Sequence, residues 1–283
     1  MVSIEKQVLS VGSLEWFYRE CRPVGEITKP PVLLLHGLVS QSYSWRSALP
    51  ALAEQGFWAI APDWIGGGFS AKPDRRDFAY TPAAFEKALE ELLQALEISS
   101  FYLVVQGFLG SVGLQYALHH PEQVERLAIF NTPLSASVKL PWRIKQMGLP
   151  LVGDMMTQDP LLVDRTLEGA GPYQVTDEAL DIYRRPFLQS SDAGRSLLAT
   201  IQNLQLSASM AEIEQGFKGW PRPTLVAWGV QDSWLPLELG RNFAAALSDG
   251  EFLELSEVGH YAQEDWPEKV NEALIPFLRR QAL

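Results

Sequence analysis

The sequence predicts an α/β fold in which helices cover both faces of a mainly parallel β-sheet. Two observations support this prediction. Strand-like runs alternate with helical segments along most of the 283 residues. Several of these runs are apolar throughout, as is typical of strands that are buried on both faces. The alternation stops once, over residues 134–220, where helical stretches follow one another without a convincing strand.

The first part of the chain is expected to open with a hairpin and then to alternate. Residues 6–12 and 14–21 are typical of two short strands hinged near Gly12 and Ser13. The clearest helix begins after Thr81, because Thr81 is a good N-cap and Pro82 suits the first turn. Further strands are expected at 31–37, 57–64, 101–107 and 124–132, and further helices at 44–56 and from 108 to His120.

After residue 220 the alternation resumes. Strands are expected at 223–229 and 251–259, and helices at 240–248 and 267–280. The predicted organisation is therefore a core domain of residues 1–133 and 221–283, with a helical domain of residues 134–220 inserted after one strand.

Composition and charge exclude several classes of partner. The net charge of −11 disfavours nucleic acid and anionic membrane surfaces, because both require a basic face. No apolar run reaches the roughly 18 residues of a membrane-spanning helix, and the N-terminus lacks a secretory signal. Cys21, expected in an edge strand with a structural role, is the only cysteine, which fits a reducing compartment. We expect a cytoplasmic protein, and the sequence carries no signal for its oligomeric state.

Ligands of open parallel sheets bind beyond the C-terminal ends of the strands, so the residues that follow each strand are the candidate site. They include glycines, which allow close approach of the backbone, and side chains that can carry out acid–base chemistry. These residues are His36-Gly37-Leu38, Asp63-Trp64, Gln106-Gly107-Phe108, Asn131-Thr132, Asp232 and His260.

With these segments the chain resembles the α/β-hydrolase fold family, in particular the branch of haloalkane dehalogenases and epoxide hydrolases. The resemblance spans about residues 30–280. It rests on "LLLHGLVSQSYSWR", "APDWIGGGFSAKP", "YALHHPEQVERLAIFNTP", "LVAWGVQDSWLP" and "VGHYAQEDWPEKV". It implies a mostly parallel, twisted sheet with a helical cap over an apolar pocket, a small apolar substrate and no cofactor. No metal-ligand spacing is found among the four histidines and one cysteine.

The family's chemistry uses a nucleophile, an acid and a histidine in that chain order. The resemblance places the acid at Asp232, in "WGVQD", and the histidine at His260, in "VGHYAQE". Asp232 would hold the His260 imidazole in one tautomer and stabilise its protonated form.

The nucleophile position departs from the family's pattern. Counting back from Pro121 and forward from the preceding strand both place it at Gly107. Glycine has no side chain and cannot form a covalent intermediate. It does tolerate the strained turn, with positive φ, that this position requires. The chain is therefore expected to keep the fold and to lack the attacking atom.

Other family features are expected only in part. The oxyanion hole would use the backbone N–H groups of Leu38 and Phe108, which survive changes of side chain. Neither of these side chains donates an N–H to a halide, which disfavours dehalogenation by the usual route. Epoxide hydrolases of this branch use tyrosines of the cap as acids. Tyr173 and Tyr183 lie in the insertion without a motif that matches them to those tyrosines, and both are more typical of packing. His36 is expected to stabilise the fold.

Three functions remain open on this basis. The first is an enzyme in which His260 and Asp232 perform general-base chemistry without a covalent step. The second is an inactive homologue that binds a small apolar ligand or a partner. The third is a hydrolase with a relocated serine, for which Ser111 would lie about one helical turn, ~5.4 Å, into the next helix, away from the cavity. The remaining serines considered are Ser40, Ser42 and Ser70.

Overall fold

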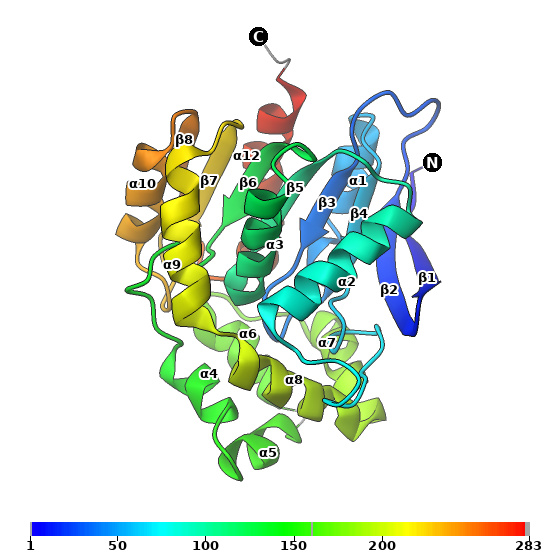
Figure 1. Cartoon of the computed structure of the whole chain (residues 1–283), viewed down its shortest axis with the longest axis vertical. Coiled ribbons are helices and arrows are strands. Elements are labelled where there is room, and N and C mark those ends of the chain that lie inside the picture. Colours follow the sequence, from blue (N-terminus) through cyan, green and yellow to red (C-terminus); the bar gives the residue numbers. More distant parts are fainter. Residues whose placement is uncertain (1, 160, 281–283) are drawn as a thin grey trace.

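The computed structural model describes residues 2–159 and 161–280 and has an eight-stranded sheet at its centre (Figure 1). The strands are β1 (Glu5–Val11), β2 (Leu14–Cys21), β3 (Val32–Leu35), β4 (Ala59–Pro62), β5 (Phe101–Gln106), β6 (Val124–Phe130), β7 (Thr224–Gly229) and β8 (Gly250–Leu255). Their order in the sheet is β1-β2-β4-β3-β5-β6-β7-β8.

The described residues also form twelve α-helices, which lie between the strands in the chain or follow the last strand. They are α1 (Ala48–Glu54), α2 (Pro82–Ala95), α3 (Gly107–His119), α4 (Trp142–Met147), α5 (Val152–Thr157), α6 (Leu162–Leu167), α7 (Asp177–Gln189), α8 (Ser191–Asn203), α9 (Leu206–Gly216), α10 (Leu237–Ala246), α11 (Ala262–Asp265) and α12 (Pro267–Arg279). Short 3-10 helices lie at Ser42–Trp45, Glu168–Ala170 and Phe217–Gly219. None of the described helices has the length and hydropathy needed to cross a membrane.

The sheet is mainly parallel, as predicted. Strands β3 to β8 pair in parallel, and only β2 pairs antiparallel to both β1 and β4. The predicted hairpin is confirmed, and Gly12 has φ +59°, which a two-residue hairpin loop needs at its first position. The expectation that Cys21 lies in an edge strand is wrong. Strand β1 pairs outside β2 and takes the edge, and Cys21 is buried opposite Ala59.

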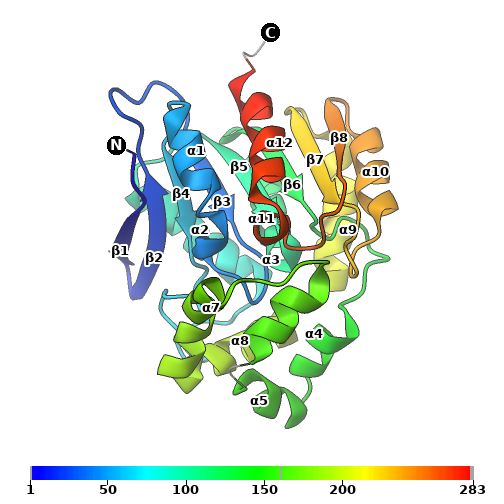
Figure 2. The same ribbon diagram turned by 180° about the vertical axis from the view of Figure 1, so that it is seen from behind.

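Successive residues of the central strands point to opposite faces of the sheet, and each face is covered by helices. In β5, Leu103 and Val105 pack in the cluster that includes side chains of α2 and α3, which cover one face (Figure 1). Val104 packs in the cluster that includes side chains of α1 and α12 on the other face (Figure 2). Burial of each such side chain contributes roughly 1.5–3 kcal/mol, so the apolar strands define the centre of the fold.

The segment between β6 and β7 contains helices only, within the described residues. Helices α4 to α8 gather beyond the C-terminal ends of the strands, whereas α9 runs back alongside α3 (Figure 1). The predicted division of the chain at residues 134 and 220 stays a prediction, and within this segment α9 packs on α3.

Helix α3 lies very close to the sheet, and glycines allow the approach. A Cβ added to Gly113 would lie 2.7 Å from Val105 Cγ1 and 2.8 Å from Leu35 Cδ1. One added to Gly110 would lie 2.9 Å from Thr132 Oγ1. The first residue of α3 is thereby held at the tip of β5, where the candidate site begins.

This close packing predicts that Gly113→Ala destabilises the protein. Overpacking of a core costs about 1–3 kcal/mol, which exceeds the gain of up to ~1 kcal/mol from helix propensity. We expect denaturant unfolding to give a net loss of about 1–2 kcal/mol. Gly219→Ala is the matched control, because a Cβ there meets no atom within 4 Å. Equal effects of the two substitutions would contradict the packing argument.

Candidate active site

Gly107 forms a sharp turn between β5 and α3. Gln106, the last residue of β5, is extended, whereas Gly107 has φ +70°, the positive value expected from the sequence. A Cβ added to Gly107 would lie 2.9 Å from Gly37 Cα and 3.4 Å from His260 Nε2. The imidazole of His260 therefore faces the point from which a side chain at position 107 would project.

The second imidazole nitrogen of His260 is bound by an acid. His260 Nδ1 lies 2.8 Å from Asp232 Oδ2, and each side chain is only 1% exposed. A carboxylate accepts this hydrogen bond from Nδ1–H, so the lone pair of the neutral ring lies on Nε2. Within the described residues Nε2 has no hydrogen-bond partner. The structure thus brings together three residues that follow β5, β7 and β8.

Asn131 is one of the strand-end residues that the sequence predicts, although no role for its side chain follows from the sequence. Its Nδ2 donates to Asp232 Oδ2 at 2.7 Å, and its Oδ1 accepts from Gly229 N at 2.8 Å. Its φ of +39° is a left-handed conformation that asparagine tolerates better than most residues. The available signal was its position directly after β6, beside the other residues at the strand ends.

Asp232 also stabilises its own loop. Its Oδ1 accepts hydrogen bonds from the backbone N–H groups of Trp234, at 2.7 Å, and Leu235, at 3.0 Å. Together with His260 and Asn131, these donors fix both carboxylate oxygens. The orientation of the imidazole is therefore set by the folded loop after β7.

Aromatic side chains surround the imidazole of His260. The ring centroids of Trp234, Tyr261 and Phe108 lie 4.6, 5.0 and 5.9 Å from that of His260. Burial raises the pKa of Tyr261, whose neutral hydroxyl donates to Leu38 O at 2.8 Å. This hydrogen bond ties the loop after β3 to the loop that carries His260.

The backbone N–H groups that the sequence predicts for an oxyanion hole have no hydrogen-bond partner among the described residues. The N–H of Phe108 is in the first turn of α3, where backbone donors have no partner within the helix. Neither this N–H nor that of Leu38 donates to any residue that the structure describes. Both donors follow one of the two touching glycines, Gly37 and Gly107.

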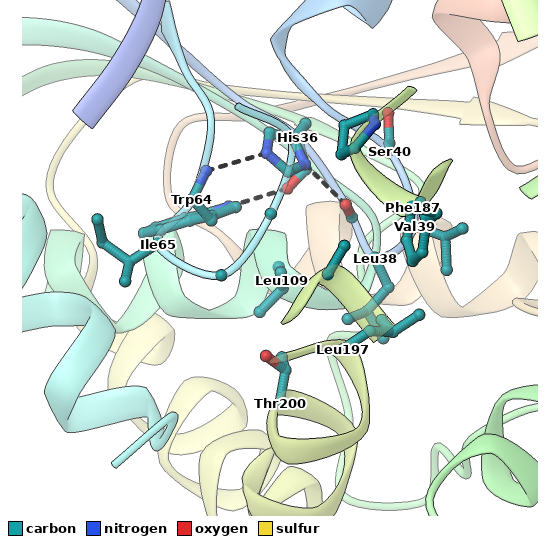
Figure 3. A pocket seen from close by; sticks show the side chains of 16 residues that line it. His36, Leu38, Val39, Ser40, Trp64, Ile65, Leu109, Phe187, Leu197 and Thr200 are labelled. Carbon is teal, nitrogen blue, oxygen red and sulfur yellow. Dashed lines mark hydrogen bonds between the residues drawn. The ribbon is translucent and has the colours of Figure 1, made fainter. Parts of the chain in front are cut away.

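His36 is held in a structural network, as expected. Its Nδ1 donates to Gly37 O at 2.8 Å, and its Nε2 accepts from Trp64 N at 3.1 Å (Figure 3). Trp64 Nε1 in turn donates to His36 O at 3.0 Å. Burial lowers the pKa of His36, so the ring stays neutral and fixes the turn after β3.

A small cavity lies beside His36 and Leu38 (Figure 3). Its volume is about 40 Å³, and it lies between the turn of Gly66–Gly68, the side chains of Leu38 and Leu109, and Phe187 and Leu197 from α7 and α8. Neither Gly107 nor His260 is among the residues that line it. The described cavity is therefore displaced from the position expected directly above these two residues.

Three of the four serines predicted as possible relocated nucleophiles form hydrogen bonds elsewhere, whereas the buried Oγ of Ser40 has no hydrogen-bond partner in the described chain. Ser111 Oγ is buried and donates to Phe108 O at 2.7 Å, inside α3. Ser70 Oγ donates to Asp63 O at 2.6 Å, and Ser42 Oγ accepts from Arg19. Ser40 lines the cavity of Figure 3.

The two tyrosines considered as acids are directed elsewhere. Tyr183 is buried and donates its hydroxyl proton to Glu264, which also forms a two-pronged ion pair with Arg46 at 2.6 and 2.9 Å. Tyr173 packs edge-on against Trp266. Within the described residues, no three His, Cys, Asp or Glu side chains are arranged to hold a metal ion.

The sheet is mainly parallel, and the turn of positive φ at the end of β5 lies next to an acid–histidine pair. This is the architecture of an α/β-hydrolase. A family model described as the alpha/beta hydrolase fold matches residues 30–267, and the chain belongs to this family.

Among curated proteins the chain is similar to enzymes. It is 30% identical over 271 residues to a cis-3-alkyl-4-alkyloxetan-2-one decarboxylase of Xanthomonas campestris, and this match covers 89% of each chain. It is 27% identical to a haloalkane dehalogenase of Mesorhizobium japonicum, covering 88% of this chain and 84% of the relative. The crystal structure of the haloalkane dehalogenase DbeA from Bradyrhizobium elkani superposes with a TM-score of 0.83 at 26% identity, covering 98% of both chains. These relatives support the expectation of a hydrolase-like enzyme on the haloalkane dehalogenase-like branch.

A further carboxylate supports the loop of His260. Asp265 Oδ2 accepts a hydrogen bond from Gly259 N at 2.6 Å. Burial raises the pKa of Asp265 to about 6, and the hydrogen bond from Gly259 only partly opposes this rise. The protonated form is thus favoured in the folded protein relative to the unfolded chain.

This shift predicts a stability that depends on pH. The contribution of Asp265 is fully present below about pH 4 and is lost as the pH rises through about 6, because the folded state binds its proton more tightly. Asp265→Asn keeps an oxygen for Gly259 and removes the ionisation. We expect a gain of about 1–2 kcal/mol at pH 8 and none at pH 4, allowing for solvent screening.

Denaturant unfolding from pH 4 to 8 measures this difference. Asp249→Asn, at an exposed carboxyl, is the control and should follow the wild type at every pH. A constant difference between Asp265→Asn and the wild type over this range would refute the assignment to Asp265.

Proposed function

We propose that this protein is a hydrolase-like enzyme for a small apolar substrate, in which His260 acts as a general base and no covalent intermediate forms. The proposal is supported mainly by one distance. A Cβ placed on Gly107 would lie 3.4 Å from His260 Nε2, but glycine has no Cβ. The imidazole is supported by Asp232 at 2.8 Å and has no hydroxyl, thiol or carboxylate at position 107 to activate.

In this mechanism the proton acceptor is His260 Nε2. It takes a proton from water, or from an acidic group of the substrate, at the place where the side chain of a nucleophile would otherwise stand. Asp232 stabilises the imidazolium that results, because it already binds Nδ1–H. General-base catalysis of this kind contributes about 10²- to 10⁴-fold in rate.

Negative charge that develops on a substrate oxygen would be stabilised by backbone donors. The N–H groups of Leu38 and Phe108 are free among the described residues and follow the two adjacent glycines. One such donor is worth about 10²- to 10³-fold in rate in a related kind of site. The hole would serve an oxyanion formed by attack of water as well as one formed by proton abstraction.

The relatives support a small substrate with apolar groups. Their names describe one enzyme that acts on an oxetanone with two alkyl substituents and others that act on haloalkanes. The side chains next to His260 and Leu38, those of Phe108, Leu109 and Trp234, are likewise apolar or aromatic. A polar or highly charged substrate would lose its hydration there without replacement.

A second candidate function is binding without catalysis. The observation that favours it over catalysis is the dense packing around the imidazole, which leaves little room for a reaction at Nε2. Trp234 and Tyr261 lie within 5.0 Å of the ring centroid, and the nearby cavity has a volume of only about 40 Å³. The third candidate, a relocated serine, is opposed by the hydrogen bond that engages Ser111 Oγ inside α3.

The first test removes the base. With a panel of short-chain esters, lactones, epoxides and haloalkanes, we expect His260→Ala to lower the wild-type kcat by about 10²- to 10⁴-fold. His119→Ala, at a partly exposed histidine of α3, is the control and should leave kcat within twofold. Wild-type activity that persists in His260→Ala would exclude the general-base mechanism, and absence of wild-type activity throughout would favour the binding function.

The second test restores a nucleophile. Gly107→Ser and Gly107→Asp should each destabilise the fold by about 1–3 kcal/mol, since the side chain takes a positive φ and crowds Gly37. Both should gain a mass adduct at residue 107 with an activated ester or a haloalkane. Gly107→Ala has the same backbone strain and no attacking atom, so it should show no adduct, like the wild type. An adduct on the wild-type peptide that carries Gly107 would overturn the proposal.

A further inference from the structure

A second, larger cavity lies away from Gly107 and His260, beside the N-terminal hairpin. Its volume is about 570 Å³, and it opens between β1 and β2, the 3-10 helix at Ser42–Trp45 and helix α7. The hairpin and α7 lie on the same side of the molecule in Figure 2. Four of its lining residues are cationic, Lys6, Arg19, Arg46 and Arg185, although the chain as a whole carries a net charge of −11.

Arg19 is the most unusual of these residues. It is only 3% exposed, and among residues 2–159 and 161–280 its guanidinium makes a single hydrogen bond, from Nη1 to Ser42 Oγ at 2.5 Å. Among the same residues, no carboxylate oxygen lies within 4.0 Å of the Arg19 guanidinium, the distance that defines an ion pair. Asp63 is the carboxylate whose charge acts most strongly on Arg19, and its two oxygens accept hydrogen bonds from the backbone N–H groups of Ser42 and Phe69. A buried guanidinium normally has a closer counter-charge, because desolvation of a charge is costly.

The neighbours of Arg19 add positive charge rather than cancel it. Lys6 is directly opposite Arg19 in the β1–β2 register, and like charges in such a pair destabilise a sheet. Arg185, on α7, forms no ion pair or hydrogen bond within the described chain and is exposed. Only Arg46 is neutralised, by its two-pronged ion pair with Glu264. The cavity therefore holds three cations whose mutual repulsion no described carboxylate relieves at contact distance.

The rest of the wall is aromatic and apolar. The guanidinium of Arg19 lies over the rings of Phe17, Tyr43 and Phe69, at 5.0, 5.5 and 5.9 Å from their centroids. Such contacts orient the planar group and leave its edge to bind an anion. Ile182 of α7 extends the apolar surface next to these rings.

We propose that this cavity binds an organic anion, with a carboxylate or phosphate head group on an apolar body. The head group would lie between Arg19, Lys6 and Arg185, and the body against Phe17, Phe69 and Ile182. Binding supplies the counter-charge that Arg19 lacks and relieves its repulsion with Lys6. Arg185 and Ile182 belong to α7, whereas the other residues belong to the hairpin and to loops near the sheet. The bound anion therefore links α7 to the hairpin. None of these residues takes part in the proposed reaction, so this inference is independent of it.

Calorimetric titration of the full chain at low salt tests the proposal with four probes of equal chain length. Octanoate and octyl phosphate should bind saturably, and the tighter of the two identifies the preferred head group. Octan-1-ol should bind at least tenfold more weakly, and octylammonium should not bind. Raising the salt concentration to 0.5 M should weaken octanoate binding severalfold, since it screens the exposed Lys6 and Arg185.

Substitutions localise the binding. The double variant Lys6→Gln and Arg185→Gln changes two exposed side chains, so it should fold normally and bind the anion at least tenfold more weakly. Arg19→Gln should reduce the affinity further, and Arg75→Gln, at an exposed arginine outside the cavity, should leave it within twofold. If Arg19→Gln fails to fold, the double variant decides.

Three results would overturn the inference. They are no saturable binding of either anion, binding of octan-1-ol or octylammonium that equals that of octanoate, and an affinity of the double variant within twofold of the wild type. In the last case the anion binds elsewhere, and the positive charge of the cavity only compensates for Asp63 and Glu264.

Discussion

The contact between two backbone turns, at Gly37 and Gly107, determines the arrangement of the whole candidate site. A Cβ at Gly37 would lie 2.7 Å from Gln106 Oε1 and 3.0 Å from Gly107 Cα, and one at Gly107 would lie 2.9 Å from Gly37 Cα. The loops after β3 and β5 approach this closely because neither residue has a side chain. The N–H groups of Leu38 and Phe108 follow these two glycines in the chain. A residue with a side chain at 107 has to push the loops apart, because its Cβ would lie 2.9 Å from Gly37 Cα.

The acid–histidine pair depends on a second convergence, at the ends of β6 and β7. Asn131 bridges the two strands by binding both Gly229 and Asp232, in a left-handed conformation that places its amide between them. The carboxylate of Asp232 is thereby oriented by hydrogen bonds other than the one to His260. The order of the parallel strands brings these groups together from positions about a hundred residues apart, as ligand sites at strand ends generally require.

Most of the fold could be predicted from the sequence, because its signals are local. Apolar runs located the strands of the sheet, Thr81 located the start of α2 with an N-cap hydrogen bond to Ala84 N, and Gly12 located the hairpin turn. Features that depend on tertiary contacts were missed. Cys21 was assigned to an edge because the pairing of β1 outside β2 leaves no local trace. The contacts of Asn131 depend on strand order, and those of Tyr183 depend on where the inserted helices pack. No local sequence pattern therefore predicts them.

Asp232 and His260 lie next to a position that has no nucleophilic side chain. Their presence can be explained by a role in stabilising the fold as well as by a role in catalysis. Asp232 receives hydrogen bonds from two backbone N–H groups and from Asn131. Its removal would leave buried donors unpaired, at a cost of about 1–3 kcal/mol each. The carboxylate would therefore be retained in an inactive protein. His260 also has structural roles at its backbone and at Nδ1, but its Nε2 has no hydrogen-bond partner in the described chain and points at an empty side-chain position. The folded structure gives this atom no hydrogen bond within the described residues, so the choice between catalysis and simple binding depends on whether Nε2 accepts a proton from a substrate or water.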